Sequence, residues 1–482
     1  MKYWRSLSVV VALLVGCEEP GSGSRAPEKE EAGRTSAQEA TPWIPCGTTA
    51  VPLGPGLPGF DPEPNEPVHA GGLLYFFSTD DASGGALWTS TGTGGEGTFK
   101  VRDFPPGPLG MPPSQLTRVG DRVFFTAEDE EHGRELWVSD GTPAGTRMVT
   151  DLWPGTNGSF PRALFEYQGL LYFTAGDEDH GRELRVTDGT AEGTLLVTDL
   201  EPGPEGAGPD RLTRSADGSI YFIAQFQAIF TAVMRLDPAT GGVVEVLRVP
   251  SEGAVLGDPT PVGSKVFFII GDLHGHKLKL MVSSGGAASL VTELTHAGDM
   301  AAMGGKLYFA GATDAEGMDM ELWRSDGTPG GTRRVKDLRT GHEGSEPIEL
   351  TAVGRRLFFS ADDGIHGREV WVSDGTETGT RLLVDLEPGL PGASPERLTA
   401  LQGNLFFSAS TGGRGAEPWM SNGTPEGTVP LVEVAPGTLD SNPRSFIRSG
   451  WDAFFTAEDG TGVRRLWALP FRPEGRCAPL RR

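Results

Sequence analysis

The sequence predicts an all-β protein built as a single closed β-propeller of about nine four-stranded blades. A twelve-residue phrase, ELWVSDGTPAGT at 135–146, recurs as ELWRSDGTPGGT from Glu321 and as EVWVSDGTETGT from Glu369. Weaker copies begin at Ala86, Glu183 and Glu417. A short apolar run precedes each copy, and glycine and proline fall at fixed places in the period. Internal repeats with periods of about 40–50 residues are typical of propeller blades.

The Trp137 position marks each copy of the unit. Its equivalents, including degenerate copies, are Trp88, Trp137, Arg185, Met234, Met281, Trp323, Trp371, Trp419 and Trp467. The steps between them are 49, 48, 49, 47, 42, 48, 48 and 48 residues. This spacing favours nine blades. The copies between Ile220 and Gly305 have lost most of the phrase, and eight blades remain if two of them merge.

Each repeat unit is predicted to contain four β-strands. Runs such as Val123–Ala127 and Leu357–Ser360 are β-branched and aromatic, and they are too short for a buried helix. The ELW strand, an outer strand and a weaker strand such as Ile348–Val353 complete the unit. The two middle strands are apolar at consecutive positions, which is typical of strands that are covered on both faces. The tryptophans on the ELW strand are therefore expected in the core, although sugar stacking is the alternative.

The DGT triplet predicts a tight turn. An Asp at its first position accepts hydrogen bonds from backbone N–H groups ahead of it, and the Gly takes a positive φ. We expect this structural role for Asp140, Gly141, Asp188, Gly189, Asp326, Gly327, Asp374 and Gly375.

These phrases resemble the ELWxxDGT repeat family of bacterial surface and secreted proteins, over roughly Leu73 to Ala468. The resemblance implies a propeller-like fold and no shared enzymatic activity. Besides the fourth and fifth copies, which have lost most of the phrase, three copies depart at single positions: Thr91 and Asn422 replace the turn Asp, and Arg185 replaces the Trp.

The first residues resemble a bacterial lipoprotein signal. Lys2 and Arg5 precede a short apolar run, which is below the ~20 residues of a membrane-spanning helix, and the run ends in LVGC. We expect a signal peptide at 1–16 and lipid attachment at Cys17; an ordinary secretory signal is the alternative. Residues 17–42 are polar and predict a disordered tether. The propeller is expected over 43–482, exported and anchored to the cell envelope.

The two ends of the repeat array complement each other. Gly47–Gly59 matches the second half of a unit, whereas the ninth copy ends after its ELW-like strand. We therefore expect the N-terminal strand to complete the last blade, because closure removes free sheet edges. Cys46 and Cys477 flank this junction, and a disulfide between them is expected; two free thiols are the alternative. Such a bridge contributes roughly 5 kcal/mol in a chain-entropy estimate.

Charge and motifs limit the function. The chain has 41 Lys and Arg against 65 Asp and Glu, a net charge of −24, which argues against nucleic acid as a partner. Acidic loops precede the ELW strand, and their carboxylates are weak Ca²⁺ candidates: Asp129, Asp177, Asp179, Asp362 and Asp363. Their spacing differs from a Ca²⁺-binding loop of the D-x-D-x-D-G type, so solvated turns are the alternative. His132, His180 and His366 lie in the same loops but in different copies, which disfavours a shared Zn²⁺ site.

No catalytic set is found, and no cofactor is expected beyond this possible Ca²⁺. The sequence favours a membrane-anchored, non-catalytic scaffold that binds a protein or a glycan. The alternative is an exported glycan hydrolase or lyase with carboxylates converging in the central channel. The degenerate copies at 220–305 are a candidate ligand region.

Overall fold

The computed structural model describes residues 42–47, 50–53, 67–80, 84–92, 97–227, 229–272, 277–314 and 316–477. These residues belong to one compact unit, which begins at Pro42. The predicted signal peptide at 1–16, Cys17 and the tether up to residue 41 lie outside the described residues. Within the described part, no helix has the length and apolar character needed to cross a membrane.

The described chain forms nine antiparallel sheets, one for each sequence copy. Blade one contains β3 (Val68–Ala70), β4 (Leu73–Asp80), β5 (Gly84–Ser90) and β6 (Thr98–Phe104). Blade two contains β7 (Ser114–Val119), β8 (Arg122–Asp129), β9 (Gly133–Ser139) and β10 (Arg147–Met148). Blade three contains β11 (Arg162–Tyr167), β12 (Leu170–Asp177), β13 (Gly181–Thr187) and β14 (Leu195–Thr198). Blade four contains β15 (Asp210–Arg214), β16 (Ile220–Phe226), β17 (Phe230–Asp237) and β18 (Gly242–Pro250). Blade five contains β19 (Gly253–Val262), β20 (Lys265–Asp272), β21 (Leu278–Ser283) and β22 (Ser289–Leu294). Blade six contains β23 (His296–Met303), β24 (Lys306–Ala312), β25 (Glu321–Ser325) and β26 (Arg333–Lys336). Blade seven contains β27 (Ile348–Val353), β28 (Arg356–Asp362), β29 (Arg368–Ser373) and β30 (Arg381–Leu382). Blade eight contains β31 (Glu396–Leu401), β32 (Asn404–Thr411), β33 (Arg414–Ser421) and β34 (Thr428–Pro430).

Blade nine joins the two ends of the described chain. It contains β35 (Arg444–Ser449), β36 (Asp452–Glu458) and β37 (Arg464–Pro473), and its outer edge is formed by β1 (Trp43–Pro45) and β2 (Val51–Leu53). β2 pairs with β37 with Val51 opposite Ala468 and Leu53 opposite Leu466. The Cys46–Cys477 disulfide lies beside this pairing and spans 431 residues. Both the predicted closure and the predicted disulfide are confirmed.

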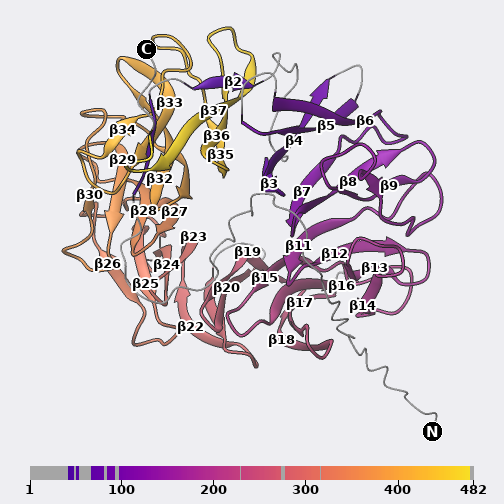
Figure 1. Cartoon of the computed structure of the whole chain (residues 1–482). Coiled ribbons are helices and arrows are strands. Elements are labelled where there is room, and N and C mark those ends of the chain that lie inside the picture. The colour runs from indigo at the N-terminus through magenta and orange to yellow at the C-terminus, as the bar shows by residue number, and fades with distance from the viewer. Residues whose placement is uncertain are drawn as a thin grey trace, which may run out of the picture. The chain divides into compact units, whose positions relative to one another are not determined.

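The blades form a closed ring around a central opening (Figure 1). The first strand of each blade lies innermost and contacts the innermost strands of both neighbouring blades. The contact between β35 and β3 joins blade nine to blade one and completes the circle. The degenerate copies at 220–305 form complete blades of their own, so the count is nine rather than the eight of the fallback prediction.

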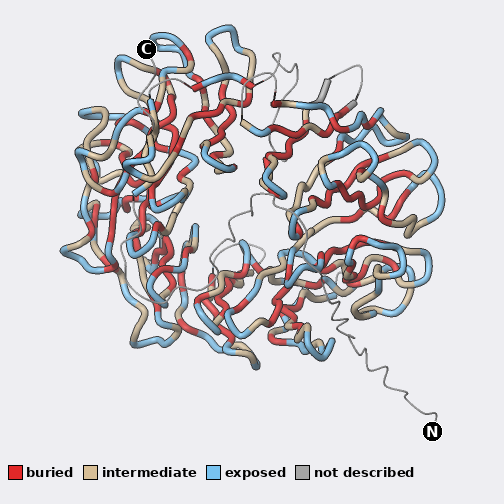
Figure 2. Tube along the Cα trace, viewed as in Figure 1, coloured by how far each residue is buried: buried red, intermediate tan, exposed pale blue. Residues whose placement is uncertain are grey.

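The core lies between blades, in the two middle strands of each sheet (Figure 2). In blade two, β9 is buried at every position. Consecutive burial explains why these strands show no apolar–polar alternation, since neighbouring blades cover both faces. Trp137 is only 4% exposed, so its predicted place in the core is confirmed.

Candidate functional site

The DGT turns have the predicted structural role. Asp140 Oδ1 accepts hydrogen bonds from the backbone N–H of Thr142 at 2.9 Å and from the Thr142 hydroxyl at 2.7 Å, and Gly141 has a φ of 89°. The same bonds and positive φ recur at Asp188 and Gly189, Asp326 and Gly327, and Asp374 and Gly375. The Thr hydroxyl, followed by the backbone N–H, lowers the pKa of each Asp. Each carboxylate is satisfied within its own turn.

In each acidic loop, an Asp carboxylate is hydrogen-bonded to the His three residues later in the same loop. In blade two, Asp129 Oδ1 accepts the backbone N–H of His132 at 2.6 Å, and Asp129 Oδ2 lies 2.9 Å from His132 Nδ1. The hydrogen bond to Asp129 raises the pKa of His132. Asp177 with His180, and Asp363 with His366, repeat the arrangement in blades three and seven.

The remaining Ca²⁺ candidates do not gather around one point. Asp362 accepts a hydrogen bond from Arg339 at 3.1 Å, and the backbone N–H of Asp179 donates to Asp177 at 3.0 Å. Asp177 also pairs with the buried Arg185. The carboxylates of Asp129, Asp177, Asp362 and Asp363 thus order the loops, and the three histidines lie in three separate blades.

A buried glutamate is the first residue of the ELW phrase in five blades, and sequence reasoning gave it no role. These residues are Glu135, Glu183, Glu321, Glu369 and Glu417, and all are fully buried. In blade two, Glu135 Oε1 accepts the backbone N–H of Ser159 at 2.7 Å, and Oε2 accepts the Ser159 hydroxyl at 2.5 Å. The loop that donates these hydrogen bonds leads to the next blade, and backbone N–H groups of the equivalent loops donate to the other four glutamates, so each glutamate fixes a connection between blades.

Burial changes the acidity of these glutamates. Loss of hydration raises the pKa of Glu135 to about 7, against the lowering effect of its hydrogen bonds. The pKa of Glu369 is likewise raised to about 7, and those of Glu183, Glu321 and Glu417 are also raised by burial. The sequence signal for this buried glutamate is an acidic residue directly before the apolar Leu-Trp pair of the phrase.

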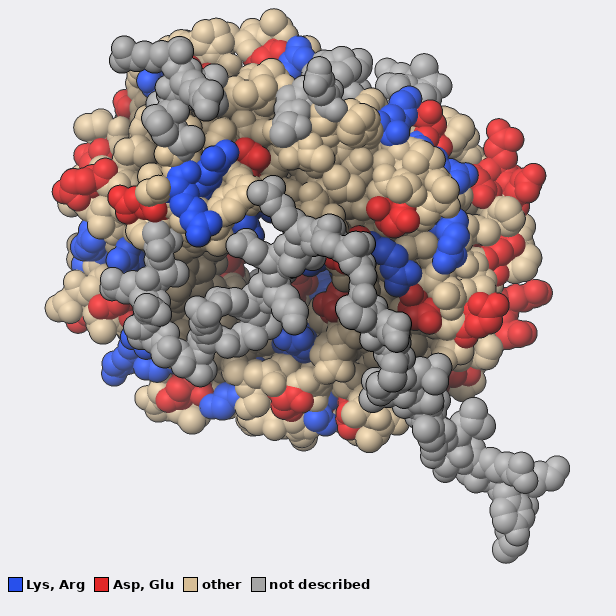
Figure 3. Space-filling view, viewed as in Figure 1, with Lys and Arg blue, Asp and Glu red and all other residues tan. Residues whose placement is uncertain are grey.

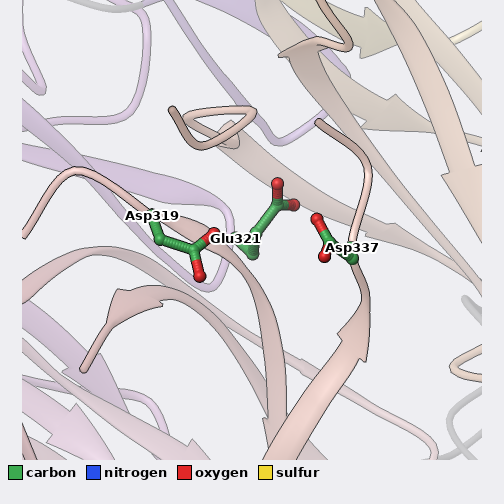
Figure 4. Close-up of side chains that lie close together, drawn as sticks. All are labelled: Asp319, Glu321 and Asp337. Atoms are coloured by element: carbon green, nitrogen blue, oxygen red, sulfur yellow. The ribbon is translucent and has the colours of Figure 1, made fainter. Parts of the chain in front are cut away.

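One group of acids in the described residues has the spacing of metal ligands. Oxygens of Asp319, Glu321 and Asp337 lie within 4.8 Å of one another, and the carboxylates of Glu321 and Asp337 face each other (Figure 4). Arg334 lies 2.9 Å from Asp319 and 3.6 Å from Asp337. Its guanidinium therefore provides the positive charge that a metal ion would supply in this cluster.

A pocket of about 900 Å³ lies in the central opening. It is lined by the innermost strands of blades four to nine, by Ile269 and Leu278 of blade five, and by Pro67. Six charged residues and four hydroxyl-bearing residues line it: Arg211, Asp258, Asp299, Glu349, Arg397, Arg444, Thr260, Thr351, Thr399 and Ser445. Acidic and basic side chains both surround the opening in the space-filling view (Figure 3).

The pocket wall is built from repeated β-bulges. The bulge residues Arg211, Glu349, Arg397 and Ser445 all have φ between 53° and 59°. A left-handed conformation is costly for residues other than glycine, and it is often found where a backbone is shaped for function. The same bulge and positive φ occur at Gln115 and Ala163 in blades two and three, outside the pocket, so the bulge belongs to the repeat and shapes the pocket wall where blades face it.

Two pocket carboxylates join neighbouring blades. Asp299 Oδ2 accepts the backbone N–H of Glu349 at 2.5 Å, and Glu349 Oε2 accepts the backbone N–H of Leu398 at 2.6 Å. Thr351 adds a hydrogen bond to the Leu398 carbonyl at 3.0 Å. Asp299 and Glu349, two of the acids that line the channel, are thus hydrogen-bonded to the backbone of the next blade.

No protein-family model matches the chain, and no curated protein matches it. Solved structures do resemble it. Dipeptidyl peptidase 4 from Porphyromonas gingivalis is 9% identical with a TM-score of 0.48, over 89% of this chain and 65% of that one. A puromycin-hydrolysing peptidase from Mycobacterium tuberculosis is 13% identical with a TM-score of 0.39, over 71% of this chain and 57% of that one.

An oligogalacturonate lyase from Vibrio parahaemolyticus is also similar. It is 13% identical with a TM-score of 0.37, over 74% of this chain and 97% of that one. The chain spans less than two thirds of the length of the two peptidases. At these identities the likeness concerns the fold alone.

Proposed function

We propose that this chain is an exported, lipid-anchored binding protein that receives a glycan in its central pocket. The observation that carries the proposal is the pocket of about 900 Å³, into which six blades bring carboxylates, guanidinium groups and hydroxyls. Ligand sites combine a concave surface with a few polar groups that fix orientation. This pocket has both features.

The mixture of polar groups favours a ligand rich in hydroxyls. A sugar hydroxyl both donates and accepts hydrogen bonds, so it can bridge a pair such as Asp258 and Arg211, whose Oδ1 and Nε atoms lie 3.7 Å apart in the pocket wall. A polyanion is a poorer match because the chain carries a net charge of −24. Lipid attachment at Cys17 would keep the pocket near the cell envelope, where glycans are abundant.

The enzymatic alternative is supported by one observation: Asp258, Asp299 and Glu349 line the same pocket. Two of them, however, accept backbone hydrogen bonds that join adjacent blades. A general acid needs a carboxyl that is available to the substrate. The geometry therefore supports binding better than hydrolysis or lysis.

The test measures binding of the full chain to an array of envelope and extracellular oligosaccharides, with peptides as a second set of probes. Thr399 lines the pocket, and Thr399→Trp would fill part of it without removing a charged group. We expect this variant to lose at least tenfold in glycan affinity. Thr378→Trp, on an exposed turn, is the matched control and should bind as the wild type does.

Two outcomes would overturn the proposal. One is equal binding by the two tryptophan variants, which would place the ligand outside the pocket. The other is release of shortened or unsaturated products from a bound oligosaccharide, which would establish the enzymatic alternative.

A further inference from the structure

Each buried ELW glutamate has a second acid sixteen residues later in the sequence. The pairs are Glu135 with Asp151, Glu183 with Asp199, Glu321 with Asp337, Glu369 with Asp385, and Glu417 with Glu433. The second acid lies beside the first and opposes its ionisation in blades two, three, seven and eight. In blade six the two carboxylates lie within 4.8 Å of each other.

Blade six compensates its pair with its own side chains. Arg334 lies 3.6 Å from Asp337, and the Ser345 hydroxyl donates to Glu321 Oε2 at 2.6 Å. Buried charges of one sign are costly unless such partners are present. Blade six thus shows what a fully satisfied pair requires: one positive charge and one hydroxyl donor.

Blade seven lacks both partners. Leu382 stands at the position of Arg334, and Ala393 stands at the position of Ser345. Glu369 Oε1 still accepts the backbone N–H groups of Glu387 and Ala393, at 3.0 Å and 2.9 Å. The missing hydroxyl leaves Glu369 Oε2 without a donor.

Two carboxylate oxygens in blade seven are buried and unpartnered in the described structure, Glu369 Oε2 and Asp385 Oδ1. Glu369 is fully buried. Within the described part of the chain, neither residue forms an ion pair with a lysine or arginine. Blade three has the same two replacements, Leu196 and Ala207, and Glu183 Oε2 is also buried without a partner, but there Arg185 brings a guanidinium to the ELW strand, where it pairs with Asp177.

We propose that Glu369 and Asp385 bind a divalent cation, with Ca²⁺ preferred. Hard cations take carboxylate oxygens at 2.3–2.6 Å, so two ligands of one Ca²⁺ lie up to about 5 Å apart. The spacing of the equivalent carboxylates in blade six is within this limit. The backbone bonds hold Oε1 and present Oε2 as the ligand atom, and water completes the coordination. A water molecule alone would satisfy Oε2 but would not offset the unfavourable ionisation of the buried Glu369 beside Asp385.

The neighbouring acidic loop does not compete for the ion. The Asp363 carboxylate is hydrogen-bonded to His366, whose Nδ1 lies 2.7 Å from Asp363 Oδ2. Asp362 forms an ion pair with Arg339. The site therefore lies behind the loop acids that the sequence singled out. With two protein carboxylates, we expect a Kd in the range of about 10⁻⁴–10⁻³ M, as in extracellular Ca²⁺ modules.

The experiment is a thermal melt of the full chain with and without 10 mM CaCl₂ (about 20 times a Kd of 0.5 mM), supported by calorimetric titration with CaCl₂ and with MgCl₂. Ca²⁺ should raise the folding equilibrium constant roughly 20-fold under these conditions. For a domain of this size that corresponds to a rise in Tm of roughly 2 °C. MgCl₂ should give a smaller rise.

Three substitutions separate this site from exposed acids. Asp385→Asn removes a ligand, and Ala393→Ser supplies the hydroxyl that blade six already has; both should abolish the Ca²⁺ response. Asp337→Asn, the matched change in the compensated blade six, should leave the response intact. A wild type that does not respond to Ca²⁺ would overturn the proposal. So would a full response in both Asp385→Asn and Ala393→Ser, since the ion would then bind only at surface carboxylates.

Discussion

Leu53 lies opposite Leu466 in an antiparallel pair, although the two residues stand at opposite ends of the propeller sequence. Leu53 is 2% exposed and Leu466 is fully buried. The ring is therefore held shut by core packing as well as by backbone hydrogen bonds. The Cys46–Cys477 disulfide fixes the same junction covalently.

Reduction of the Cys46–Cys477 disulfide should destabilise the folded protein. Among the described residues it is the disulfide that a reductant would break. Loss of a native disulfide typically costs about 2–5 kcal/mol. For a propeller of this size we expect Tm to fall by roughly 2–5 °C on reduction. Differential scanning calorimetry with and without reductant measures the change. A Cys46→Ser/Cys477→Ser variant should melt at the lower temperature and ignore the reductant; an unchanged wild-type Tm would refute the role of the bridge.

The buried Glu135 should make stability depend on pH. Its pKa is raised from 4.5 to about 7 in the folded protein, so between these values the folded state holds a proton that the unfolded state has released. Stability from this group is full below pH 4.5, falls as the pH rises and is lost above about pH 7. The shift corresponds to roughly 3 kcal/mol.

Glu135→Gln tests this link, because the amide oxygen still accepts the Ser159 N–H but does not titrate. Chemical unfolding at pH 5 and pH 8 should show a smaller loss of stability in the variant than in the wild type, by roughly 3 kcal/mol. Parallel losses in the two proteins would show that Glu135 is ionised throughout.

The DGT turn should not tolerate a side chain at its glycine. Gly141 has a φ of 89°, and an added Cβ would lie 2.8 Å from both Leu73 Cδ1 and the Tyr75 hydroxyl. We expect Gly141→Ala to cost about 1–3 kcal/mol in unfolding free energy. Gly330→Ala is the control: a Cβ there meets nothing within 4 Å, and blade two already has Ala144 at that place. Equal stabilities of the two variants would mean that the turn is not constrained as described.

Much of the architecture could be predicted from the sequence because each blade repeats the same local chemistry. The Asp140–Gly141 turn is a local interaction, and it is encoded by residues that are adjacent in the chain. Closure was predictable for a different reason: the segment after Cys46 supplies the strand that the copy before Cys477 lacks. Blade number followed from period alone, even where the phrase had decayed between Ile220 and Gly305.

The sites were harder to predict because they depend on contacts between distant segments. Glu135 meets Ser159 only after the chain has crossed to the next blade, and the pocket joins bulges from six blades. The loop acids appeared to be free Ca²⁺ ligands in the sequence, yet Asp129 is engaged by His132 three residues later. The exposed, acidic character of such loops is the same whether their carboxylates bind a metal or order the turn.

The shared blade nine is the central claim, since the ring and its pocket exist only if the two ends meet. Peptide mapping of the unreduced protein by mass spectrometry tests it most directly. We predict a cross-linked peptide that contains Cys46 and Cys477. Quantitative alkylation of both cysteines in the absence of reductant would contradict the disulfide-bonded closure of blade nine.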